Sequence, residues 1–207
     1  MRVGGLSGRR PPVNAPRVYS APLRLLHGVT AVLVVAQFAL AATNALVYES
    51  RPVLAEAVVQ AHLSIGAVVL VLTMIRLIGR LSRPAPVLPN DMSIAWKTSA
   101  RMVHMALYLL LILLPVTGYV KLAALGFQIS VFGLVALPAL PFNTELAALA
   151  RTAHLALAIL LCLMVFGHVL AAVFHARLFG CPILHRMWPV LTRSCVSAQR
   201  SVLKTNG

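Results

Sequence analysis

Four long apolar runs are the feature that most constrains the fold of this chain. Each run reaches the length of about 20 residues that an α-helix needs to cross the hydrocarbon core of a bilayer. Charged residues make up only 11% of the 207 residues, which is too little to cover a water-soluble globule. We therefore predict an all-α integral membrane four-helix bundle, with spans at approximately Arg24–Val47, Leu54–Ile78, Ala100–Val120 and Leu146–Phe174.

The remaining sequence consists of two termini and one long connection. Residues 1–20 are basic and rich in Gly, Pro and Arg, a composition that predicts a disordered arm. We assign the bundle to residues 21–190 and a basic tail to residues 191–207. The stretch Leu122–Pro141 is apolar but interrupted by glycines and prolines. It predicts either a short interfacial helix or a loop folded against the bundle.

Basic residues separate the two sides of the predicted bundle. Fifteen of the 18 Lys and Arg residues fall in residues 1–24, 76–101 and 177–204, which the four spans place on one side. The positive-inside rule then predicts that this side and both termini are cytoplasmic. We interpret the net charge of +14 as a signal for topology beside membrane lipid, and not for nucleic-acid binding. The other side carries three basic and three acidic residues: Arg51, Lys121, Arg151, Glu49, Glu56 and Glu145.

Five of the seven histidines lie inside the spans or at their ends, where an imidazole needs a partner. Sorted by depth, His62 and His154 lie near the predicted periplasmic side. His27 and His168 lie near the predicted cytoplasmic side, and His104 lies at a similar depth to them. The histidines therefore form two layers.

His154 and His168 are 14 residues apart, close to a whole number of helical turns, so both point the same way at a separation of roughly 21 Å. One helix can thus offer an inward imidazole at each membrane face, while other helices supply an opposite imidazole. Two facing imidazoles from different helices of a bundle are what axial ligation of haem iron needs.

Two other interpretations of these histidines stay open. A single membrane histidine is more often a hydrogen-bonded packing residue than a ligand. A metal or proton path would normally recruit carboxylates, and no Asp or Glu lies deep inside a span. Arg76 and Arg80 lie four residues apart at one span end, on one helical face. They are candidates to pair with haem propionates or simple anchors of the topology.

Several sequence blocks, taken together in order, resemble the bacterial cytochrome b561 family of four-helix di-haem cytochromes. The resemblance covers about Arg24 to Pro189. It rests on LRLLHGVTA, AHLSIGAVVLVLTMIRLIGRL, RMVHMALYLLLILLPVTGYV, VFGLVALPALP, AHLALAILLCLMVFGHVLAAVFHARL and ILHRMWP.

The resemblance implies two haem b groups in the bacterial inner membrane, one between His27 and His168 and one between His62 and His154. It also implies electron exchange with ubiquinone and with a periplasmic partner, which is superoxide for some members of the family. Other members resemble anchor subunits of hydrogenases or dehydrogenases. His104 then remains a candidate to contact a propionate or a quinone, or to pack.

This chain departs from the family pattern at two positions. Leu155 follows His154 where members often have an acidic residue, and Leu63 follows His62 where they often have lysine. The predicted periplasmic side is also near neutral, which does not favour the steering of an anion such as superoxide. A haem-free metal or proton transporter remains the alternative outside this family.

Overall fold

The computed structural model describes residues 20–82 and 94–178, with side chains as far as Phe174. The predicted disordered arm, apart from Ser20, lies outside the described residues, as do the tail at 191–207 and His185. The side chain of His175 lies outside them as well.

The described residues form helices α1, α2, α3 and α4, each long and apolar enough to cross a membrane. This confirms the predicted all-α membrane bundle. Every helix extends beyond its predicted apolar run, because the runs mark only the part suited to hydrocarbon and a helix continues into the polar interface. Their bounds are Ala21–Val47, Pro52–Leu81, Ile94–Ala123 and Thr144–Leu178.

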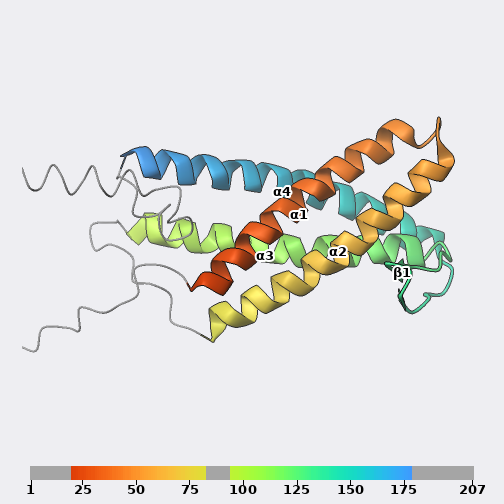
Figure 1. Ribbon diagram of the computed structural model, residues 1–207, viewed down its shortest axis with the longest axis horizontal. Coiled ribbons are helices and arrows are strands. Elements are labelled where there is room, and N and C mark those ends of the chain that lie inside the picture. The colour runs from red at the N-terminus through yellow and green to blue at the C-terminus, as the bar shows by residue number, and fades with distance from the viewer. Residues whose placement is uncertain (1–19, 83–93, 179–207) are drawn as a thin grey trace, which may run out of the picture.

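The helices pack as two antiparallel hairpins. α1 packs along α2, α3 packs along α4, and the two hairpins meet mainly where α2 contacts α3. In Figure 1 the α1–α2 hairpin crosses the α3–α4 hairpin obliquely. We call the end of the bundle at Ala21, Leu81, Ile94 and Leu178 the basic end, and the opposite end the loop end.

A small apolar core lies at mid-height of the bundle and takes one buried residue from each helix. These residues are Val34, Val69, Leu110 and Leu161. Leu161 is seven residues from both His154 and His168, which places it about 10 Å from each along α4. The apolar core therefore separates the two histidine layers.

The connection between α3 and α4 is a loop with a short hairpin, so of the two predicted alternatives the loop is confirmed. Strands β1 (Ser130–Val131) and β2 (Val135–Ala136) pair antiparallel. The turn between them places Phe132 and Gly133 at φ 52° and 69°, the positive values that a type I′ turn requires.

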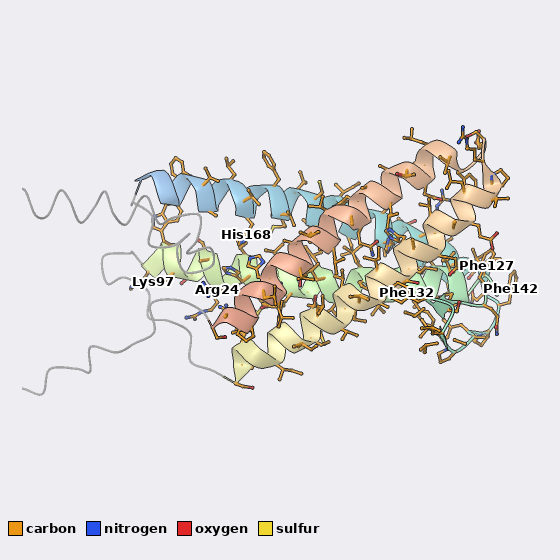
Figure 2. All side chains as sticks on the ribbon, viewed as in Figure 1. Arg24, Lys97, Phe127, Phe132, Phe142 and His168 are labelled. Atoms are coloured by element: carbon orange, nitrogen blue, oxygen red, sulfur yellow. The ribbon has the colours of Figure 1, made fainter. Side chains whose placement is uncertain are left out.

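Two hydrogen bonds fasten this loop to the helices. The Phe132 amide donates to Ser64 Oγ on α2 at 2.9 Å, and the Tyr119 hydroxyl on α3 donates to the Pro138 carbonyl at 2.6 Å. Figure 2 shows Phe127, Phe132 and Phe142 gathered at the loop end, opposite Arg24 and Lys97 at the basic end. Exposed aromatic rings at a span end suit the membrane interface.

Candidate functional site

The loop end brings together two of the predicted ligands, His62 of α2 and His154 of α4. Their ring centroids lie 6.3 Å apart with the ring planes at 71°. Metal–imidazole bonds are about 2 Å long, so two rings on opposite sides of one metal have centroids roughly 6 Å apart. The observed separation therefore fits two axial ligands of a single iron.

Hydrogen bonds orient the His154 ring for this role. Its Nδ1–H donates to the Leu114 carbonyl of α3 at 3.0 Å, and the Thr117 hydroxyl lies 3.2 Å from the same nitrogen. A carbonyl only accepts, so the proton is on Nδ1 and the lone pair is on Nε2. This is the arrangement by which a histidine ligand is usually held. Gly118 allows the contact, since a Cβ there would lie 3.1 Å from His154 Cε1.

His62 is positioned through its backbone by a residue of α1. The Gln37 amide donates from Nε2 to the His62 carbonyl at 2.9 Å. Gln37 Oε1 and His62 Nδ1 are both buried with no hydrogen-bond partner among the described residues. A Cβ at Gly66 would lie 2.9 Å from Gln37 Nε2. The absence of a side chain at Gly66 thus makes room for this amide.

A cavity of about 930 Å³ surrounds the two imidazoles. This volume is at the large end of the roughly 300–1,000 Å³ found for small-molecule sites. Most of its lining is aliphatic, and the α3–α4 loop contributes Ile129, Val131, Leu137 and Pro138. A large, mainly apolar cavity with two opposed imidazoles is chemically suited to a porphyrin.

The basic end holds the other three membrane histidines. The rings of His104 and His168 lie 5.3 Å apart, edge to face, which is short for two ligands on opposite sides of one metal. His104 Nδ1–H donates to the Ala100 carbonyl of its own helix at 2.6 Å. His27 interacts electrostatically with His168, and no described residue hydrogen-bonds its buried Nδ1. His168 therefore lies against His104 and within electrostatic range of His27.

Arginines surround this histidine group. The Arg76 guanidinium lies 5.7 Å from the centre of the Tyr108 ring, a cation–π distance, and interacts electrostatically with His27 and His168. Arg80 lies within electrostatic range of His104. The Nε of Arg24, one turn before His27, is buried with no hydrogen-bond partner in the part of the chain that the structure describes. From the sequence we predicted Arg76 and Arg80 for this region, but not Arg24.

No group of three or more His, Cys, Asp or Glu side chains gathers into a metal site within the described residues. At the loop end the predicted ligands instead form one opposed pair beside the large cavity. Two imidazoles alone fit a metal that is held mainly by its own macrocycle, as haem iron is.

Comparison with known proteins identifies the family of the chain. The family described as prokaryotic cytochrome b561 matches residues 18–190. The chain belongs to this family. Membership makes it a b-type cytochrome of the bacterial inner membrane, crossing the bilayer several times.

Two curated relatives of this cytochrome b561 are similar over about 60% of its length. It is 34% identical over 128 residues to a protein of Yersinia pestis named probable superoxide oxidase CybB, covering 62% of this chain and 73% of the relative. It is 32% identical over 132 residues to cytochrome b561 homolog 2 of Escherichia coli strain K12, covering 61% of this chain and 66% of the relative.

Proposed function

We propose that this cytochrome b561 carries two haem b groups and passes electrons between a periplasmic redox partner and the ubiquinone pool. The observation that carries the proposal is the opposed His62–His154 pair, 6.3 Å apart in a cavity of about 930 Å³. Two imidazoles at that spacing would hold one haem iron between them.

The second haem is proposed at the basic end, between His27 and His168. Support comes from their proximity and from the buried, unpartnered Nδ1 of His27. Arg76, beside both histidines, is suited to pair with a propionate, and Arg80 is a second candidate. His104 is proposed to contact a propionate or a quinone and not to bind iron, since its ring lies against His168.

In this function the protein holds the two haem groups, orients their histidine ligands and shields the haems from water. Four imidazoles bind the two proposed haems. The helix rise between His154 and His168 on α4 separates the haems by about 21 Å along the axis. Leu114 and Thr117 fix the His154 ring, and the apolar core at mid-height excludes water between the two levels. Held by two histidines, a haem would supply electron transfer and not oxygen binding.

We propose superoxide as a donor at the loop end, which the charge distribution assigns to the periplasm. One relative is named a probable superoxide oxidase. The net charge of this side is near zero, so the proposal for superoxide rests on this similarity and not on electrostatic steering.

Stopped-flow absorbance tests both partners with the purified, haem-loaded protein. A short-chain ubiquinol should reduce the oxidised haem, and the corresponding quinone should reoxidise it. A superoxide-generating system should also reduce the haem, and superoxide dismutase should suppress that reduction. Haem that responds to neither form of the quinone would contradict the quinone assignment. Reduction unaffected by the dismutase would exclude superoxide as the donor.

A further inference from the structure

Two cations share the cavity that holds His62 and His154. Lys121, at the end of α3, and Arg151, in the second turn of α4, are the only charged residues among those that line it. Lys121 is half-buried, whereas Arg151 is exposed. Both therefore lie where the apolar cavity meets the polar edge of the bundle.

The two cations lie close together and close to the imidazoles. Lys121 interacts electrostatically with Arg151, His62 and His154. Like charges beside an apolar cavity destabilise the fold unless an anion lies between them. Among the described residues, the cavity lining supplies no carboxylate, and its amide acceptors include the buried Oδ1 of Asn44 and Oε1 of Gln37, which no described residue pairs with. A negatively charged group of a bound ligand would offset the repulsion between the two cations.

We propose that Lys121 and Arg151 bind the two propionate carboxylates of the haem held between His62 and His154. The inference rests on the proposed function. Haem b has an apolar ring with two carboxylates on one edge, and the cavity has an aliphatic body with two cations. Charge-assisted hydrogen bonds from Lys and Arg to carboxylates are about twice as strong as neutral ones. The pair thus fixes the rotation of the ring about its iron axis.

The test measures the reduction potential of this haem in a variant that carries no other. His27→Ala removes the proposed ligand at the basic end, so the remaining haem reports on the loop end alone. In that background Lys121→Met with Arg151→Met should lower the ratio of reduced to oxidised haem at fixed ambient potential. The expected change is about tenfold for each charge removed, the size for one charge about 10 Å away at an effective dielectric constant of about 20.

The direction of this change follows from charge. Without the cations, the propionates are no longer neutralised and favour the ferric iron. Arg51→Met is the matched control, because Arg51 lies on the same side, at the start of α2, but does not line the cavity. It should leave the potential unchanged. Arg151→Met alone, at an exposed position, should give a smaller change in the same direction if the double variant does not fold.

Reconstitution with the dimethyl ester of haem separates propionates from any other anion. Ordinary haem should dissociate faster from the Lys121→Met, Arg151→Met variant than from the parent, because the ion pairs are lost. Esterified haem should dissociate from both proteins at the same rate. A difference that persists would assign the two cations to a free anion and overturn the proposal, as would an unchanged potential with ordinary haem. A His27→Ala protein that retains no haem, or two, would instead overturn the proposed ligand pairing itself, and this inference with it.

Discussion

Replacing His62 with alanine removes one haem from the protein and leaves the other in place. The alanine takes away one of the two imidazoles that lie 6.3 Å apart, and a porphyrin iron with a single histidine ligand is held far less tightly. The site at the basic end lies beyond the apolar core, so it should keep its haem. The haem-to-protein ratio should fall by about half, measured as the pyridine haemochrome of the purified protein. His154→Ala should give the same result.

His104→Ala is the matched control for this prediction, because it removes a half-buried membrane histidine that we do not place on iron. It should retain the full haem content. Loss of both haems in His62→Ala would contradict two independent sites, and loss of neither would contradict the pairing with His154. Loss of one haem in His104→Ala would mean that His104, and not His27, is the ligand opposite His168.

Gly118→Val should abolish haem binding at the loop end without any change to a ligand. A Cβ at Gly118 would lie 3.1 Å from Cε1 and 3.3 Å from Nδ1 of the His154 ring. The further methyl groups of valine force the imidazole away from Leu114 and Thr117, which orient it. Overpacking of this kind costs about 1–3 kcal/mol, and displacing the ring also removes its fit to iron. The absorption spectrum should show one haem per chain.

Gly167→Ala provides the comparison, since a Cβ at that position meets no atom within 4 Å. It should keep the loop-end haem. Gly118→Ala should give a result between those of Gly118→Val and Gly167→Ala: the loop-end haem should still bind, but it should dissociate faster in detergent. Full haem content in Gly118→Val would show that the close packing of His154 against α3 is not needed for ligation.

Much of the architecture was predictable because the bilayer restricts it. Apolar length fixes the spans, and the 14-residue spacing of His154 and His168 places both on one face of α4. The depth order of His62 and His154 followed from their positions in the spans, and the structure brings these two together. These features depend on distances along single helices, which sequence determines directly.

Features that depend on contacts between helices were not predicted. Gln37 matters because α1 packs along α2 and brings its amide to the His62 carbonyl. Gly118 matters because α3 packs along α4. Polar and small residues inside an apolar span are a weak signal for such roles, since they also occur in ordinary helix packing. The β1–β2 hairpin was missed because its strands are only two residues long.

The net charge of the loop end did not predict the charge of the residues that line its cavity. The three basic and three acidic residues of that side cancel in a sum, yet the cavity lining selects Lys121 and Arg151 and no acid. Only the fold shows which charges share a surface.

Two haems per chain, held by four histidines, can be detected directly in a dithionite-reduced minus oxidised absorption spectrum combined with a pyridine haemochrome ratio. The protein should be purified in detergent after haem-supplemented expression. We expect a b-type spectrum with two haems per chain. A ratio of one would contradict the second site, and a colourless protein would show that these histidines do not bind haem.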